Sequence, residues 1–190
     1  MTYFIVKYSG PFGFIKPWTA VRDSKTFSQQ FLTASIVEGI EKKLFPETFL
    51  QKGIQKIIRY KLTYSSINVQ QEVTQTRGWE FKKQNSLMIR NKSILERGVM
   101  INPELQLVFL NMDDAKNAAI QHICLCRNED IMLPSEQINQ MTDLEFDLLD
   151  GFELRFGDVE DSFITGYNRF NNAQAMYGKL EVTGNPVKNS

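Results

Sequence analysis

Residue types that perform enzyme chemistry are scarce in this chain of 190 residues. It has one histidine, His122, so a pair of histidines acting as acid and base is excluded. A serine–histidine–aspartate triad would have to use that residue alone. The phosphate-binding pattern GxxxxGK(S/T) is absent, and no GxGxxG follows a predicted strand. These absences leave little support for catalysis, and we expect no cofactor.

Metal sites and disulfides are also disfavoured. The only cysteines, Cys124 and Cys126, alternate with His122 and would share one face of a strand with it. Side chains two residues apart on a strand are about 7 Å apart, which is too wide for a tetrahedral metal site without a bend. Acidic pairs such as Glu129-Asp130 and Glu160-Asp161 could bind Mg²⁺ but are usually solvated. We therefore expect buried, reduced thiols and no metal, as in a cytoplasmic protein.

Long hydrophobic runs are missing as well. No apolar run approaches the roughly 18 residues of a membrane span. The segment MTYFIVKYSG does not have the layout of a signal peptide, because Lys7 interrupts a short apolar stretch. With 42% apolar and 23% charged residues, the composition is that of a globular protein. We expect one domain, or one and a half, without a membrane partner.

The charges are balanced in number but not in position. Residues 1–126 carry 17 Lys/Arg and 10 Asp/Glu, whereas residues 127–190 carry 5 and 12. A basic front and an acidic back suit a protein that holds a polyanion with one part and keeps the other away from it. A dipolar surface without a ligand explains the same numbers equally well.

The order of predicted elements indicates a fold class. Strands are predicted over 2–8, 54–70 and 98–111, the last bent at Asn102-Pro103. A helix is predicted over 33–47, and residues 113–126 read as a short helix that passes into a strand by Ile123. This order predicts an α+β protein with a ferredoxin-like, RNA-recognition-type β-α-β-β-α-β sheet over residues 1–135.

Details of the first helix and of the C-terminal third can also be predicted. Ser35 and Glu38 have the spacing of a capping box, and Pro46 ends the helix. Gly39 lies inside it, which suggests a close approach to another backbone, with the sheet as the expected neighbour. Residues 136–190 are acidic and contain several glycines. They predict a small, mostly β or irregular subdomain packed on the sheet.

A basic insertion separates two of the predicted strands. Residues 71–98 carry six Lys/Arg against three Asp/Glu and show no clear core-forming period. Such a stretch is either a solvated loop or a basic β-hairpin that orders against nucleic acid. Trp79 and Phe81 are large rings for a linker. Trp79 would either stack on a base or cap the protein's own core.

The connection after the first strand is rich in glycine and aromatic residues. In GPFGFIKPW, residues 10–18, glycine would let backbone N–H groups approach a phosphate, the rings would stack on bases, and the lysine would neutralise phosphate. Alternatively, the segment is a Pro/Gly turn whose rings pack into the core.

These residues carry a resemblance. A first strand ending in Gly-x-Phe, an aromatic-Lys-Pro step and Thr-x-Ser-x-x-x-Gly-Ile at the start of a helix resemble the CRISPR-associated protein 5 family of the repeat-associated RNA-binding superfamily. The matching residues are Gly10, Phe12, Phe14, Lys16, Pro17, Thr33, Ser35, Gly39 and Ile40. A weaker match is LCRNEDIMLP, residues 125–134, in which Cys126 replaces the family's usual glycine. The resemblance covers roughly residues 1–135.

The resemblance implies a role and a set of partners. Members are subunits of type I Cascade complexes that bind the 5′ handle of the CRISPR RNA (crRNA), contact the large subunit and the first backbone subunits, and meet target DNA indirectly. A basic β-hairpin "thumb" reaches along the RNA, and residues 71–98 lie where it would be. Combined with the pattern above, this predicts the RNA-binding residues Gly10, Phe12, Gly13, Phe14, Lys16, Trp18, Arg22, Lys25, Arg77, Trp79, Lys82, Lys83, Arg90, Lys92 and Arg127.

Three functions remain open. Most members of the family do not cleave RNA, which favours a non-catalytic subunit of a complex similar to type I-B, or of a transposon-associated complex that finds targets. The first rival is a metal-independent endoribonuclease that processes precursor crRNA with His122 and a lysine or tyrosine. The second is a protein-only scaffold whose basic arm binds an acidic partner.

Overall fold

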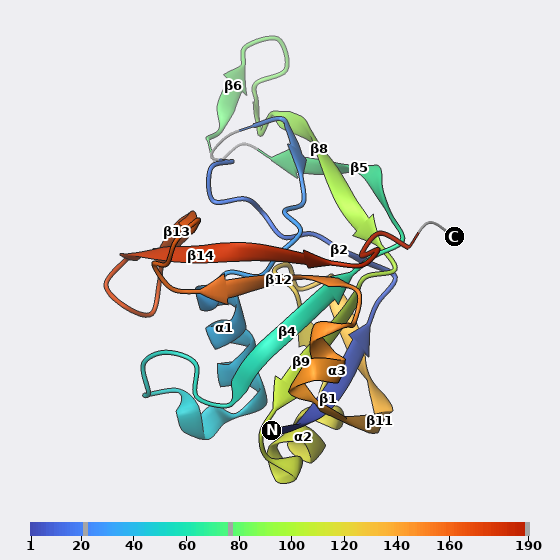
Figure 1. Cartoon of the computed structure of the whole chain (residues 1–190). Helices are drawn as coiled ribbons and strands as arrows, with labels where there is room; N and C mark the ends of the chain where they lie inside the picture. The colour runs from blue at the N-terminus through green and yellow to red at the C-terminus, as the bar shows by residue number, and fades with distance from the viewer. Residues whose placement is uncertain (21–22, 76–77, 189–190) are drawn as a thin grey trace.

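The computed structural model describes residues 1–20, 23–75 and 78–188 and shows a mixed α+β protein with mostly antiparallel sheets and few helices (Figure 1). The strands are β1 (Thr2–Ser9), β2 (Phe12–Gly13), β3 (Lys25–Phe27), β4 (Ile57–Thr63), β5 (Ser66–Gln75), β6 (Glu80–Lys82), β7 (Leu87–Ile89), β8 (Lys92–Ile101), β9 (Glu104–Phe109), β10 (Ile123–Cys124), β11 (Ile131–Thr142), β12 (Gly151–Phe156), β13 (Phe163–Asn168) and β14 (Gln174–Thr183). The helices are α1 (Ala34–Leu44), α2 (Met112–Ala119), α3 (Asp143–Asp147) and the 3-10 turn η1 (Pro46–Thr48).

One sheet of eight strands forms the body, in the order β10-β11-β1-β9-β4-β12-β14-β13. Every pairing in it is antiparallel. Its middle, β11-β1-β9-β4, is made by β1 and β4, which flank α1 in the chain, and by β9 and β11, which flank α2. The C-terminal strands β12, β14 and β13 extend this sheet beyond β4.

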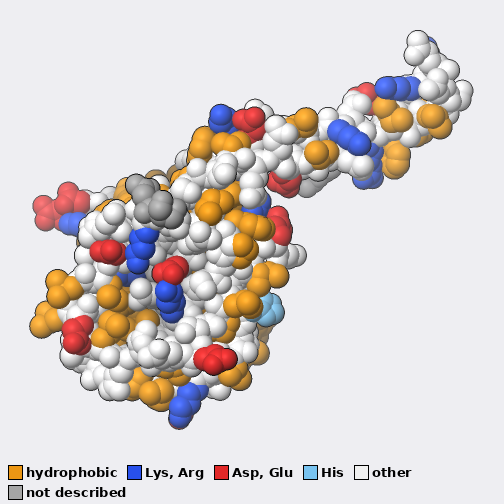
Figure 2. All heavy atoms as spheres, turned by 90° about the vertical axis from the view of Figure 1, so that its right-hand side faces the viewer, with side chains coloured by type: hydrophobic (Ala, Val, Ile, Leu, Met, Phe, Trp, Pro, Cys, Tyr) orange, Lys and Arg blue, Asp and Glu red, His pale blue; other side chains and the backbone are white. Residues whose placement is uncertain are grey.

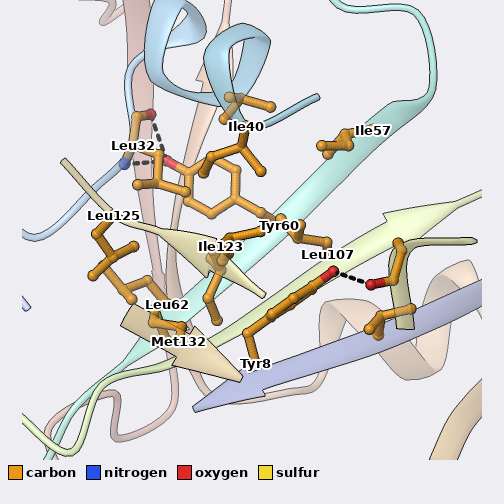
Figure 3. Packing of buried hydrophobic residues seen from close by; sticks show 14 of the residues in the cluster. Tyr8, Leu32, Ile40, Ile57, Tyr60, Leu62, Leu107, Ile123, Leu125 and Met132 are labelled. Carbon is orange, nitrogen blue, oxygen red and sulfur yellow. Dashed lines mark hydrogen bonds between the residues drawn. The ribbon is translucent and has the colours of Figure 1, made fainter. Parts of the chain in front are cut away.

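Alternation along the strands divides buried side chains between the two faces of the sheet. On one face, Tyr8 of β1 and Leu107 of β9 join α1 and α2 in the main core (Figure 3). On the other face, Ile5 and Val108 pack with Phe146 of α3 in a smaller cluster. Each helix therefore covers apolar positions that the strand period supplies.

Tyr60 connects three segments inside the main core. Its hydroxyl donates to the carbonyl of Leu32 at 2.8 Å and accepts from the N–H groups of Leu32 at 2.9 Å and Leu154 at 3.0 Å (Figure 3 draws the bonds to Leu32). Burial raises the pKa of Tyr60, so the hydroxyl stays protonated and can both donate and accept hydrogen bonds. This group ties the segment before α1 and strand β12 to β4.

Replacing Tyr60 with phenylalanine should lower the free energy of unfolding by about 3 kcal/mol, because two buried N–H groups and one carbonyl lose their partner. The matched control is Tyr64→Phe, since Tyr64 is equally buried but its hydroxyl accepts one bond, from Gln30. We expect a loss of about 1 kcal/mol there. Urea denaturation measures both, and equal losses would show that the hydroxyl of Tyr60 has no special role.

Charged side chains hold α3 on the second face. Lys61 is 2% exposed, and its Nζ donates to the carbonyl of Asp147, the last residue of α3, and to that of Leu149 just beyond it. Burial lowers the pKa of Lys61. At the other end, the Thr142 hydroxyl and the Glu145 carboxylate form a reciprocal capping box. These bonds satisfy backbone groups at both ends of a five-residue helix that could not persist alone.

Residues 64–103 leave the body and return to it. β5 and β8 pair in an unbroken antiparallel ladder from Ser66–Ile101 to Gln75–Lys92, and β6 and β7 form a small hairpin at its tip. This arm projects far from the body (Figures 1 and 2). Residues 186–188 run beside its root, where Tyr64 accepts from the N–H of Lys188 and donates its own N–H to Pro186.

Two predicted strands are each divided in the structure. The predicted strand 54–70 is β4 and β5, and the predicted bent strand 98–111 is β8 and β9. The breaks face each other, since the N–H of Ser65 donates to Ile101. Asn102 adopts a φ of 48°, and Pro103 has no N–H to continue a ladder. The bend predicted at Asn102-Pro103 is therefore a change of sheet.

Predictions for α1 were partly wrong. The prediction that Pro46 ends the helix is confirmed: α1 stops at Leu44 with Phe45 as its C-cap, because the residue before a proline is disfavoured in helical conformation. The predicted capping box is absent: Thr33 is the N-cap, and Glu38 is buried against Lys42. A Cβ on Gly39 would lie 2.8 Å from Nη2 of Arg169, in the turn between β13 and β14, and not against the sheet.

The C-terminal third is mostly β, which is one of the two predicted alternatives. The boundary expected near residue 135 falls inside β11, and the strands that follow continue the same sheet.

None of the helices in the described ranges has both the length and the apolar character that a membrane-spanning helix requires.

Candidate nucleic-acid interface

The tip of the arm carries cations without ion-pair partners. Lys82, Lys83 and Lys92 are exposed, and none lies within ion-pair distance of a carboxylate in the part of the chain that the structure describes. Arg90 has no carboxylate partner there either, and its guanidinium carbon lies 4.7 Å from the centre of the Trp79 ring. Arg77 lies outside the described residues. Uncompensated cations on a projecting hairpin are available to phosphates.

Large apolar side chains accompany these cations. Trp79 is 56% exposed and contacts the Arg90 side chain, so it does not cap the protein's own core. Phe81 and Met88 face each other across the tip hairpin and are also more than half exposed. An exposed ring stiffened by a stacked guanidinium can receive a base or an apolar side chain of a partner.

The two glycines of the 10–18 connection serve packing. The N–H of Gly10 donates to the carbonyl of Pro103, and a Cβ there would lie 2.5 Å from the carbonyl oxygen of Ile131. Gly13 is buried, and a Cβ there would lie 2.4 Å from Leu125. Neither glycine therefore has the role predicted for it, in which open backbone N–H groups receive a phosphate.

Phe14 and Arg127, two further predicted RNA contacts, are engaged in the protein's own packing. Phe14 is 3% exposed, and the guanidinium carbons of Arg97 and Arg127 lie 5.9 and 5.3 Å from its ring centre. Arg127 makes a bidentate ion pair with the fully buried Asp130. The hydrogen bonds that Arg127 donates to this carboxylate raise the pKa of Arg127. This cluster fastens the 125–130 turn to the body.

Lys16 and Trp18 keep accessible positions. Lys16 is exposed and has no ion pair among the described residues, and Trp18 is 44% exposed, edge-on to Tyr167 at 5.8 Å. Phe12 is half-buried in β2. Lys25 is exposed and pairs with Glu96 at 3.5 Å. Arg22 lies outside the described residues.

Apart from Lys25, which is paired with Glu96, the accessible predicted RNA contacts therefore form two groups, at the arm tip and at residues 16–18. Tyr167 beside Trp18, and Arg169 nearby, were not among the predictions. Both come from the acidic C-terminal third, where no motif distinguished them, and only the pairing of β13 with β14 brings them to α1.

The groups weighed for chemistry do not assemble. β10 ends at Cys124, so His122 and Cys126 do not share one strand face with it, and Cys126 is exposed rather than buried as predicted. Among residues 1–20, 23–75 and 78–188, no three His, Cys, Asp or Glu side chains are placed to hold a metal.

Comparison with known proteins gives a likeness of fold. No family model matches the sequence, and no curated protein matches it. Sixteen chains of solved structures do match. One belongs to a structure titled "CRISPR RNA-guided surveillance complex". It aligns over 95% of this chain and 90% of its own, with a TM-score of 0.53 and 8% sequence identity. The two chains share a fold over nearly their whole length.

Proposed function

We propose that this protein is a non-catalytic RNA-binding subunit of a type I CRISPR surveillance complex, of the CRISPR-associated protein 5 kind. The fold likeness supports this, because it spans both chains almost completely. The strand order β11-β1-β9-β4 with one helix in each half is the arrangement expected of a ferredoxin-like sheet, and the arm is inserted between its second and third strands.

The projecting arm is the observation that carries the proposal. Its tip holds four described cations without ion pairs, beside two exposed aromatic rings, Trp79 and Phe81. Proteins bind single-stranded RNA by combining phosphate neutralisation with stacking of bases on such rings. In the complex, the arm and residues 16–18 contact the 5′ handle of the crRNA. The large subunit and the backbone subunits pack around them, and the assembly is cytoplasmic.

A salt titration of RNA binding tests the proposal. A fluorescein-labelled single-stranded repeat RNA is titrated with the full chain between 50 and 300 mM KCl, with anisotropy as the readout. We expect the logarithm of the association constant to fall linearly with the logarithm of salt, by about 0.7 for each phosphate contact. Micromolar binding that does not respond to salt would contradict the proposal, and so would no binding at all.

The same sample distinguishes the two rivals. RNA recovered after incubation in EDTA and separated on a denaturing gel should remain intact. Cleavage at one position within the repeat would establish the endoribonuclease. If an acidic protein such as polyglutamate displaces the RNA at equal charge concentration, the arm is a general anion binder, as the scaffold hypothesis requires.

A further inference from the structure

A groove runs along α1 from Ser35 to Lys43, between the 16–18 segment and the β13–β14 hairpin. It consists of two adjoining hollows that share Ser35, Ile36 and Cys126. One hollow opens toward Lys16, Trp18 and Tyr167, and the other toward Lys43 and Arg169. The groove thus joins segments that are more than one hundred residues apart in the sequence.

Charge distinguishes this groove from the rest of the C-terminal surface. Three cations line it and no carboxylate does, although residues 127–190 hold 12 of the 22 acidic residues. None of Lys16, Lys43 and Arg169 makes an ion pair within the described ranges. The first turn of α1 contains no acidic residue either. A polyanion entering the groove therefore meets attraction along its whole length.

Arg169 is held in place by its surroundings. Its guanidinium carbon lies 4.8 Å from the ring centre of Phe170, and it occupies the space that a side chain at residue 39 would fill. The hairpin that carries it is tied to α1 by Asn168, whose Nδ2 donates to Glu38. The charge of Glu38 is itself matched by Lys42 at 3.2 Å. Because Gly39 has no side chain, the guanidinium of Arg169 can lie against this face of α1.

The other end of the groove offers rings. Trp18 and Tyr167 are edge-to-face with ring centres 5.8 Å apart, and both are about half exposed. The Trp18 side chain lies against Gly166, where a Cβ would be only 3.3 Å away. Anchored rings with one open face are suited to stacking a base, and an acidic peptide would leave them unused.

We propose that this groove binds one or two nucleotides of single-stranded RNA, with a base against Trp18 and Tyr167 and phosphates between Lys16 and Arg169. The proposal rests on the RNA-binding function above. It extends the contact assigned there to residues 16–18 into a groove on the body that includes Tyr167 and Arg169 and acts together with the arm. Since the two sites lie on one chain, each raises the effective concentration of RNA at the other.

Tryptophan fluorescence tests this site separately from the arm. The chain has two tryptophans, so Trp79→Phe leaves Trp18 as the sole reporter. In that background, a ten-nucleotide oligouridylate should quench Trp18 emission on saturation. Adding Arg169→Gln should weaken oligouridylate binding about fivefold or more and reduce its salt slope by about 0.7. The control is Lys52→Gln, on the loop after η1. It removes one charge from an exposed lysine that has no ion pair among the described residues. The affinity of this variant for oligouridylate should change less than twofold.

The outcomes separate this inference from the proposed function. If anisotropy shows salt-dependent binding while Trp18 emission stays constant and Arg169→Gln binds as the parent does, the RNA uses the arm alone and the groove proposal fails. If the wild-type chain does not bind RNA at all, both proposals fail. Equal quenching by oligoglutamate of the same charge would make the groove a general anion site and overturn the assignment to RNA.

Discussion

Replacing Arg59 with leucine should lower the free energy of unfolding by about 4 kcal/mol. Arg59 is 9% exposed, and its guanidinium bonds Glu153 twice at 2.8 Å. It also contacts Asp143 at 2.7 Å and Asp147 at 2.6 Å. Burial by itself would lower the pKa of Arg59, but these carboxylates raise it. Removing the cation leaves Glu153, at 3% exposed, with only the more exposed Arg155 at 3.2 Å.

A matched control separates burial from charge. Arg155 belongs to the same network, but its side chain is 36% exposed. Arg155→Leu should therefore cost about 1 kcal/mol or less. The double variant Arg59→Leu/Glu153→Leu should be more stable than Arg59→Leu alone, because no buried charge is then left unpaired. Urea denaturation at pH 7 measures all three. A double variant less stable than the single variant would mean that Arg59 acts by packing on Phe146.

The second large effect concerns binding instead of stability. Val73 and Ile94 are partners in the β5–β8 ladder, so residues 74–93 can be replaced by an Asn-Gly turn that joins them. β3 pairs with β8 only at residues 96–98, and the body is untouched. We expect the shortened chain to unfold at the same temperature within about 2 °C. RNA affinity at 100 mM KCl should fall at least tenfold, and the salt slope should decrease by about 0.7 for each phosphate that the arm neutralises in the intact chain.

A full-length control distinguishes the charge of the tip from its shape. Arg77, Lys82, Lys83, Arg90 and Lys92 are changed to glutamine while Trp79 and Phe81 remain. If charge dominates, this variant and the shortened chain should have equal salt slopes, and the rings should account for the remaining difference in affinity. Unchanged RNA affinity after shortening would refute the arm as an RNA contact.

Strands and helices whose formation depends on neighbouring residues could be predicted from the sequence. The aromatic and β-branched run at residues 2–8 is β1, and the predicted helix 33–47 contains α1. A hairpin within residues 71–98 was one of two alternatives, and the structure contains it. Where each strand ended could not be predicted, because Tyr64 and Ser65 continue the alternation of apolar and polar residues while the chain changes sheet.

Other features depend on distant partners and could not be seen in the sequence. Gly10 and Gly13 fit a phosphate-binding loop and a close-packed turn equally well, and only the positions of Ile131 and Leu125 decide between them. The sequence does not show that Arg127 is paired, because the ion pair depends on a turn that brings Asp130 beside it. Arg169 reaches α1 through strand pairing that spans the C-terminal third, and no short motif encodes such a pairing.

The course of residues 186–188 beside Tyr64 has a practical consequence for attaching the protein to surfaces and labels. The C-terminal end of the described chain lies near the root of the arm, while Met1 lies at the opposite end of the body (Figure 1). A biotin or fluorophore linked through the N-terminus would leave the arm and its surroundings open to solution. The same group attached at Lys188 would stand beside the arm's root and would compete for space with whatever binds there.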